Sequence, residues 1–288
     1  MIPASVTAFC PGHISGYFRR VDGRDPSTTG SIGAGIVISE GVTSTVRPAD
    51  TVSVIVRMQP AGGAPVEISR SSPPLASALD RLGVTVAVET LCRLPISAGF
   101  GLSAAALLST LTATNRLLGL GLAADEIAEI AHETEVKFKT GLGDVAACQG
   151  GGRVVRTGPG IHGTIHRSFD LAGPISAVCF GPIHTPDVLG SPEQMARVAG
   201  AFPAKQPETA AEFFACCREF SEKSGLETAS VKKVLAACNR NNIPAAMTML
   251  GDGVFAYGAG AADVLRPFGA VYGMQMAKSG TQILEVNK

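Results

Sequence analysis

The stretch Pro95-Ile-Ser-Ala-Gly99-Phe-Gly101-Leu-Ser103-Ala-Ala-Ala determines where this sequence of 288 residues places its chemistry. It predicts the end of a strand, a glycine-rich turn and the start of a helix. Glycines let the backbone approach an anion closely, and the first N–H groups of a helix have no partners within the helix. Because the helix dipole adds partial positive charge there, the turn is typical of a phosphate-binding site. Glycine spacing alone fits an ordinary strand-to-helix turn equally well.

Two common nucleotide-binding motifs do not account for this turn. The sequence contains no G-x-x-x-x-G-K-[ST], which excludes a P-loop. The segment 99–104 satisfies the loose G-x-G-x-x-G/A pattern of a dinucleotide site, and Asp125 follows it downstream. Such a site needs its acid at the end of a second strand, whereas Asp125 lies in the first turn of a predicted helix. We therefore do not expect a dinucleotide-binding domain.

The sequence on both sides of the turn predicts an α+β protein. Residues 1–95 are mainly strands separated by Gly, Pro and Ser clusters, and helices rich in Ala and Leu follow them. A soft boundary near residue 165 gives two expected domains, 1–165 and 166–288. The expected strands are 6–9, 35–39, 43–47, 51–58, 84–93, 153–156, 175–180, 270–276 and 281–286, and the expected helices are 103–118, 123–139, 191–201, 208–224, 230–241 and 244–250.

Composition and charge exclude several classes of protein. Apolar residues make up 45% of the chain and charged residues 17%, which excludes intrinsic disorder. Lys plus Arg and Asp plus Glu are both 24, so neither a nucleic-acid binder nor a protein held at anionic lipid is expected. The seven cysteines show no C-x-x-C spacing, the N-terminus does not look like a signal peptide, and segment 102–122 is too polar to span a bilayer. We expect a cytoplasmic protein without a membrane or nucleic-acid partner.

A carboxylate is expected to point inward near the end of the predicted helix 123–139. The charged face of this helix carries Glu133, whereas its apolar stripe, continued by one turn, reaches Glu135. Burying an acid is costly unless it is paired or binds a cation, so Glu135 is a candidate site residue. A frayed helix end that exposes Glu135 is the alternative. Asp144 follows two glycines and, taken alone, would be only a turn or N-cap residue.

Taken together, these motifs resemble those of the GHMP small-molecule kinases. The segment 95–106 looks like their P-x-G-x-G-L-G-S-S-A loop. Ala131-His-x-x-Glu135 and Thr140-Gly-x-x-Asp144 resemble their A-H-x-x-E and S-G-x-D segments, and Cys10-Pro-Gly-His13 falls where the family has its first P-G-[KRH] motif.

Within that superfamily, segments 11–18, 29–35 and 140–145 look most like the archaeal pantoate kinases. The resemblance is clear over residues 10–155 and weakens afterwards. The departures from the family pattern are Ser97 in place of a loop glycine, Leu102 in place of the first paired serine, and Lys278-Ser-Gly-Thr281 as a remnant of the C-terminal glycine motif.

The resemblance implies a two-domain GHMP fold, with an N-terminal mixed sheet and a C-terminal α+β domain, and a kinase that uses ATP and Mg²⁺. The acceptor that it implies is the primary hydroxyl of pantoate, giving 4-phosphopantoate in coenzyme A biosynthesis. Two alternatives stay open: a GHMP kinase acting on another hydroxy acid such as homoserine or mevalonate, and a GHMP-like binding protein without turnover. Relatives in the family are often dimers, so the resemblance also allows a homodimer.

The resemblance also implies roles for individual residues. Asp144 would act as base or orienter for the substrate hydroxyl, and Ser103 and Glu135 would hold Mg²⁺ against the β- and γ-phosphates. Arg156 is the first choice for a bidentate contact with the substrate carboxylate. Further expected substrate contacts are Ser31, His132 and His13. The expected nucleotide-binding residues are Pro95, Ser97, Ala98, Gly99, Phe100, Gly101, Leu102, Ser103 and Ala104.

Overall fold

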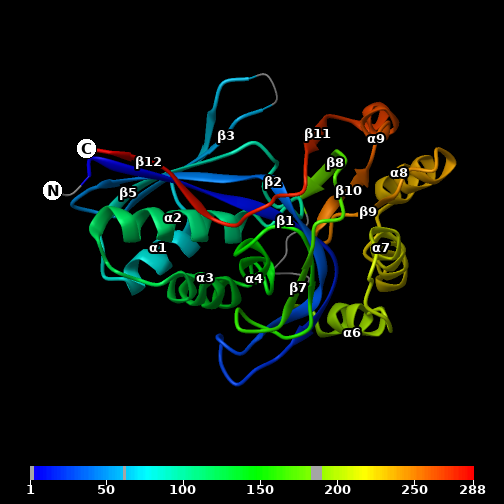
Figure 1. The fold of residues 1–288 in the computed structure, drawn as a ribbon, viewed down its shortest axis with the longest axis horizontal. Coiled ribbons are helices and arrows are strands. Elements are labelled where there is room, and N and C mark those ends of the chain that lie inside the picture. Colours follow the sequence, from blue (N-terminus) through cyan, green and yellow to red (C-terminus); the bar gives the residue numbers. More distant parts are fainter. Residues whose placement is uncertain (1–2, 61–62, 183–189) are drawn as a thin grey trace.

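A large mixed sheet forms the frame of the N-terminal half of the molecule (Figure 1). The computed structural model describes residues 3–60, 63–182 and 190–288. The sheet has the order β12-β1-β2-β5-β3-β4, with β6 paired to β2 and β7 paired to β6. Neighbouring strands are antiparallel except β3 and β5, which run parallel. The strands are β1 (Ser5–Val21), β2 (Gly30–Pro48), β3 (Ser53–Met58), β4 (Val66–Ser69), β5 (Val86–Cys92), β6 (Arg153–Arg156), β7 (Ile165–Ser168) and β12 (Gln282–Asn287).

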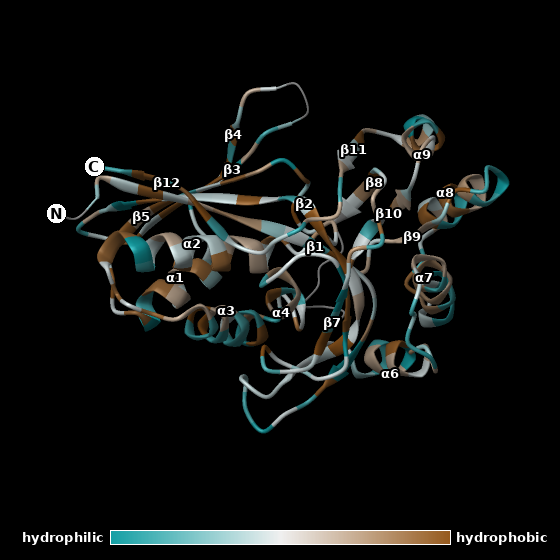
Figure 2. Ribbon diagram, in the orientation of Figure 1, coloured by the Kyte–Doolittle hydropathy of each residue, from teal (hydrophilic) through white to brown (hydrophobic). Residues whose placement is uncertain are grey.

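One face of this sheet is covered by helices in two layers. Helix α2 (Leu102–Leu118) packs directly on β1 and β2, and α3 (Ala124–Phe138) packs on α2. Because α2 carries Ala and Leu around its circumference, it can be buried between the sheet and α3 (Figure 2). Helix α1 (Pro73–Arg81) lies beside α2 and α3, and the short α4 (Asp144–Cys148) contacts β1 and both longer helices.

A smaller antiparallel sheet organises the second unit, in the order β11-β8-β10-β9. Its helices α6 and α7 also contact β1, so the long first strand joins the two units. Aromatic rings hold this junction: Tyr17 of β1 meets the Phe202 ring edge-on at 5.5 Å. The elements are β8 (Ile175–Pro182), α6 (Pro192–Gly200), α7 (Ala210–Ser224), α8 (Ala229–Arg240), β9 (Ala245–Met247), β10 (Gly251–Tyr257), α9 (Ala261–Leu265), the 3₁₀ helix η1 (Arg266–Phe268) and β11 (Val271–Met274).

The predicted α+β class with a mixed sheet is confirmed. The prediction left out the elements β4, β7, β10, α1, α4, α9 and η1. Two predicted elements also differ from the structure. The expected helix 244–250 is the short strand β9 followed by a tight turn. The last strand, expected to close the second unit, pairs instead with β1. The division into 1–165 and 166–288 stays a prediction, with β7 and β12 both belonging to the larger sheet. Within the described residues, no helix is long and apolar enough to span a membrane.

Candidate active site

The glycine-rich turn predicted to bind phosphate leads directly into α2. Gly99 and Gly101 have φ values of 83° and 60°, which a side chain disfavours. Ser97, the residue in place of a loop glycine, has a φ of 60° as well. The His13 amide of β1 donates a 2.9 Å hydrogen bond to the Phe100 carbonyl, and a methyl group at Gly101 would lie 3.0 Å from the His13 carbonyl oxygen. Close packing on β1 therefore fixes the shape of the turn.

The start of α2 is open to an anion. Its N-cap residue is Gly101, which makes no side-chain cap hydrogen bond. The first helical hydrogen bond joins the Ala105 amide to the Gly101 carbonyl at 3.2 Å, so the amides of residues 102–104 have no acceptor within the helix. Ser103 is the second residue of the helix and not its cap, and its hydroxyl hydrogen-bonds to Glu135. The helix dipole and these amides together favour a phosphate here.

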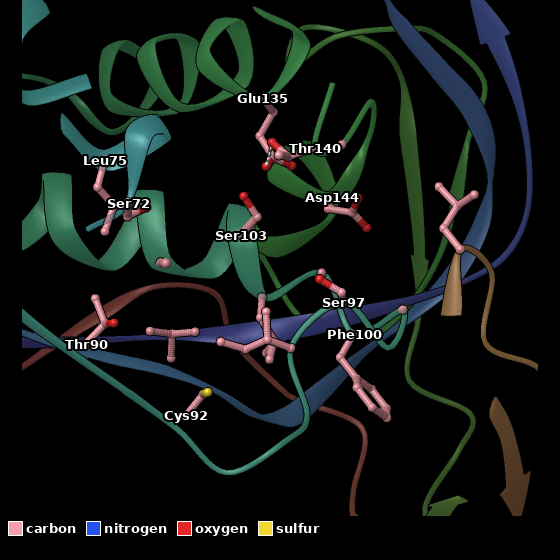
Figure 3. Close-up of a pocket in the computed structure, with 18 of the residues that line it drawn as sticks. Ser72, Leu75, Thr90, Cys92, Ser97, Phe100, Ser103, Glu135, Thr140 and Asp144 are labelled. Atoms are coloured by element: carbon pink, nitrogen blue, oxygen red, sulfur yellow. Dashed lines mark hydrogen bonds between the residues drawn. The ribbon is translucent and has the colours of Figure 1, made fainter. Parts of the chain in front are cut away.

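Glu135 points inward and is 1% exposed, so the alternative of a frayed helix end is wrong. Thr140 Oγ1 donates a 2.6 Å hydrogen bond to Glu135 Oε1, and the Ser103 hydroxyl donates another to the carboxylate. Burial, followed by the charge of Asp144, raises the pKa of Glu135 to about 7 against the effect of both hydrogen bonds. Figure 3 shows Ser103, Glu135 and Thr140 facing one another. The charged form of the buried Glu135 carboxylate is therefore disfavoured without a cation, and a hydroxyl lies beside it.

Asp144 is the first residue of α4, and its carboxylate is held by β1. His13 Nδ1 lies 2.7 Å from Asp144 Oδ1, and the His13 ring is fully buried. Burial lowers the pKa of His13, so the neutral ring donates its Nδ1 proton to the carboxylate. Burial alone would raise the pKa of Asp144, but the His13 hydrogen bond and the charge of Arg156 hold it below its usual value. Asp144 is therefore an ionised hydrogen-bond acceptor at neutral pH.

Arg156 brings a buried positive charge beneath the loop that carries Asp144. The side chain is 3% exposed, and its guanidinium occupies the space that a side chain at Gly143 would need. Its Nη1 donates to the carbonyl and the hydroxyl oxygens of Ser31, each at 3.0 Å. Its Nε has no hydrogen-bond partner within the described part of the chain. Arg156 and Ser31 thus form a polar pair next to Asp144.

His132 lies apart from the other expected substrate contacts. Its Nε2 hydrogen-bonds to the Thr29 carbonyl at 2.8 Å, and the ring is 1% exposed. It borders a small hollow formed with Ser27, Thr28 and His162. Three residues on a helix span about 300°, so the directions of His132 and Glu135 differ by about 60° and the two side chains face different hollows.

A cavity of about 510 Å³ connects the turn, Glu135 and Asp144 (Figure 3). Of the expected residues, Pro95, Ala98, Ala104, His13, His132 and Arg156 lie outside its lining, and the rest line it. One end is mainly apolar and was missed by the sequence analysis. The polar Thr90 and the thiol of Cys92, which continue the buried face of Val86 and Val88 along β5, were the available signal. The residues of that end are Val42, Val56, Ile68, Ser69, Ser71, Ser72, Pro73, Leu75, Thr90, Cys92, Ile96 and Ala106, together with the expected Leu102.

The second unit reaches the phosphate-binding turn through the turn 248–251. A methyl group on Gly99 would lie 2.8 Å from the Met249 carbonyl oxygen, and one on Gly251 would overlap the Ala98 carbonyl. Met249 and Leu250 line the cavity. The segment 278–281, expected to be the remnant of the C-terminal glycine motif, bridges to Gly150 behind α4. The glycine of the second unit that packs against the phosphate-binding turn is therefore Gly251.

Comparisons with known proteins agree with this geometry. Residues 74–152 match the GHMP kinases N terminal domain. The chain is 47% identical to the pantoate kinase of Methanospirillum hungatei over 97% of this chain and 96% of that protein, and 32% identical to the pantoate kinase of Thermococcus kodakarensis over 87% of each.

Solved structures show the same fold. A structure described as a phosphotransferase related to the CoA biosynthesis pathway superposes with a TM-score of 0.76 at 24% identity, over 97% of this chain and 98% of that one. Mevalonate-3-kinase from Thermoplasma acidophilum superposes with a TM-score of 0.65 at 14% identity, over 99% of this chain and all of the other. With 47% identity over nearly its full length to a pantoate kinase, the chain is a small-molecule kinase that belongs to the pantoate kinase family of the GHMP kinases.

Proposed function

We propose that this enzyme transfers the γ-phosphoryl group of ATP to the primary hydroxyl of pantoate and releases 4-phosphopantoate and ADP. The observation that carries the proposal is that Ser103, Glu135 and Asp144 open into one cavity at the start of α2. A phosphoryl transfer needs a cradle for the triphosphate, neutralisation of its charge and a positioned acceptor hydroxyl. Each requirement has a matching feature in this cavity.

ATP would lie along the length of the cavity. The apolar end between α1, α2 and the sheet suits a flat purine base, with Val56, Ile68 and Leu75 as its packing surface. The triphosphate would then reach the turn 97–103, where the amides at the start of α2 point at its oxygens. Among the described lining residues there is no Lys or Arg, so backbone amides and a metal ion must supply the neutralisation.

The residues around Glu135 fit Mg²⁺. Magnesium prefers oxygen donors and is commonly held by one or two carboxylates together with substrate phosphates. Glu135 and Ser103 offer a carboxylate and a hydroxyl in contact, and the raised pKa of Glu135 reports a carboxylate that a cation would stabilise. Bound there, Mg²⁺ would neutralise charge on the β- and γ-phosphates.

Asp144 would accept a hydrogen bond from the primary hydroxyl of pantoate and take its proton as the new P–O bond forms. Its low pKa makes it a weak base but an ionised one, which suits a transfer in which proton removal lags behind bond cleavage. His13 would hold the carboxylate by Oδ1, leaving the other oxygen free for the acceptor.

The carboxylate of pantoate would bind at Ser31, which lines the cavity, and the buried Arg156 guanidinium behind Ser31 would favour its negative charge without touching it. The Ser31 hydroxyl accepts a hydrogen bond from Arg156 and lines the cavity, so both residues would act on the same end of the acceptor. His132 would act indirectly: its hydrogen bond to the Thr29 carbonyl holds the start of β2, and with it the position of Ser31.

A panel of acceptors tests the proposal. ADP release with ATP and Mg²⁺ would be measured with pantoate, homoserine, mevalonate and pantothenate, and the product analysed by mass spectrometry. We expect turnover with pantoate only. Homoserine carries an ammonium that Arg156 repels, and pantothenate keeps the primary hydroxyl but replaces the carboxylate by an amide. Preferred turnover of homoserine or mevalonate would replace the acceptor, and absence of ADP release with every alcohol would favour a binding protein.

A further inference from the structure

Helix α4 is too short to be stable by its own hydrogen bonds. It spans only Asp144–Cys148, and isolated helices of fewer than about 12 residues are marginal in water. The amide of Ala147 bonds to the Gly143 carbonyl at 3.1 Å, and the amide of Gly150 reaches the Ala147 carbonyl only at 3.4 Å. Its last carbonyl groups therefore need other donors. What supplies them decides how firmly Asp144, at the other end of the helix, is held.

Arg167 supplies these donors from β7. Its Nη1 donates to the Ala147 carbonyl at 2.9 Å and to the Gly151 carbonyl at 2.8 Å, and its Nη2 donates to the Ala146 carbonyl at 3.2 Å. One planar guanidinium thus ties the end of α4 to the glycine segment that follows it. Its positive charge lies at the helix C-terminus, where it is favourable. Strand β7 and α4 lie side by side in Figure 1.

Gly150 makes room for this contact. A methyl group at Gly150 would lie 2.9 Å from both Cζ and Nε of Arg167, too close for the side chain to stay in place. The first glycine of the Gly150-Gly-Gly152 run is thereby explained by a guanidinium packed on the backbone. The partly buried hydrogen bonds of Arg167 and the glycine that leaves room for its side chain both point to the same contact.

We propose that Arg167 is a positioning residue for phosphoryl transfer: by holding the C-terminal end of α4, it sets the position of Asp144 at the N-terminal end. The inference rests on the proposed role of Asp144. Nothing places Arg167 in the cavity itself, so it acts through the helix and does not touch substrate. Because a misplacement of about 1 Å in an active site costs about a hundredfold in rate, a small shift of α4 is enough to be measured.

A double-mutant cycle between Arg167 and Asp144 tests the proposal. We expect Arg167→Met to lower kcat by at least about tenfold with the KM for ATP changed by less than about threefold, and Arg167→Lys to lie between it and the wild type. In the Asp144→Asn background, Arg167→Met should change the residual rate by less than about twofold, because there is no carboxylate left to position. The control is His166→Ala, an exposed neighbour on the same strand, which should leave kcat unchanged.

The outcomes are distinguishable. If Arg167→Met lowers the rate by the same factor with and without the Asp144 carboxylate, the side chain acts on the fold as a whole and the inference is wrong. An unchanged kcat in the soluble, folded Arg167→Met enzyme also overturns it. Should Arg167→Met not fold, Arg167→Lys and Gly150→Ala are compared in the same cycle. Near-normal turnover by Asp144→Asn alone would instead reject the proposed role of Asp144.

Discussion

The Nδ1 atom of His13 lies 2.7 Å from Oδ1 of Asp144, joining the first strand of the sheet to the first residue of α4. The two residues are 131 positions apart in sequence. Since His13 is fully buried and neutral, the bond leaves Asp144 ionised and fixed in direction. His13 therefore acts on the acceptor site indirectly, by holding the Asp144 carboxylate in place.

Replacing His13 should reduce turnover without abolishing ATP binding. A hydrogen bond to a charged group contributes about 1.5–3 kcal/mol, so His13→Leu should lower kcat by about tenfold to a hundredfold. His13→Asn, whose amide nitrogen can replace Nδ1, should retain more activity. Steady-state kinetics on both variants checks this order, and equal activity of the two would show that the donor is irrelevant.

Glu135 and Glu133 form a matched pair two residues apart on α3. Glu135 lines the cavity, whereas Glu133 pairs with Arg81 away from it. Glu135→Gln should lower kcat by at least about a hundredfold because the metal loses a charged ligand, while Glu133→Gln should stay within about twofold. Activity as a function of Mg²⁺ concentration measures the difference. Similar losses in both variants would contradict the assignment of Glu135 to the metal.

The raised pKa of Glu135 predicts a pH-dependent stability of the metal-free protein. The folded carboxyl has a pKa of about 7 against an ordinary value of 4.5, so between these values the folded state holds more protons than the unfolded state. The free energy of unfolding therefore falls as pH rises from 4.5 to 7, by up to about 3 kcal/mol. Glu135→Gln should raise Tm at pH 8 and leave it nearly unchanged at pH 5. Thermal unfolding at the two pH values measures this, and the same shift at both would exclude the carboxyl as its source.

The turn 248–251 should govern ATP use from the second unit. Gly251→Ala should lower kcat/KM for ATP by at least about tenfold, because its methyl group displaces the Ala98 carbonyl in the phosphate-binding turn. Gly273→Ala is the control, since a methyl group there meets nothing within 4 Å. Kinetics at saturating pantoate compares the two variants. An unaffected Gly251→Ala enzyme would show that the contact is dispensable.

Local sequence signals predicted part of the site, namely the phosphate-binding turn, α2 and α3, but not α4, which carries Asp144. They did not predict which strands pair over long distances in the chain. Gly, Pro and Ser clusters bounded the predicted strand β5, glycine placement and helix formers predicted the turn and α2, and the helical stripe predicted the inward direction of Glu135. No local signal indicated that the last strand returns to β1, because strand pairing depends on the whole fold. The segment 244–250 has helix-forming residues, but three of them pair with β10, and tertiary context overrides weak propensity. The partner of His13 was hidden for the same reason.

The most direct test of the account is the Asp144→Asn enzyme, assayed for turnover and for ATP binding in parallel. If Asp144 orients and deprotonates the acceptor beside a triphosphate held by other residues, kcat with pantoate should fall by at least about a thousandfold while the Kd for ATP with Mg²⁺ stays within about threefold of the wild-type value. Near-normal turnover, or a loss of ATP binding as large as the loss of rate, would contradict it.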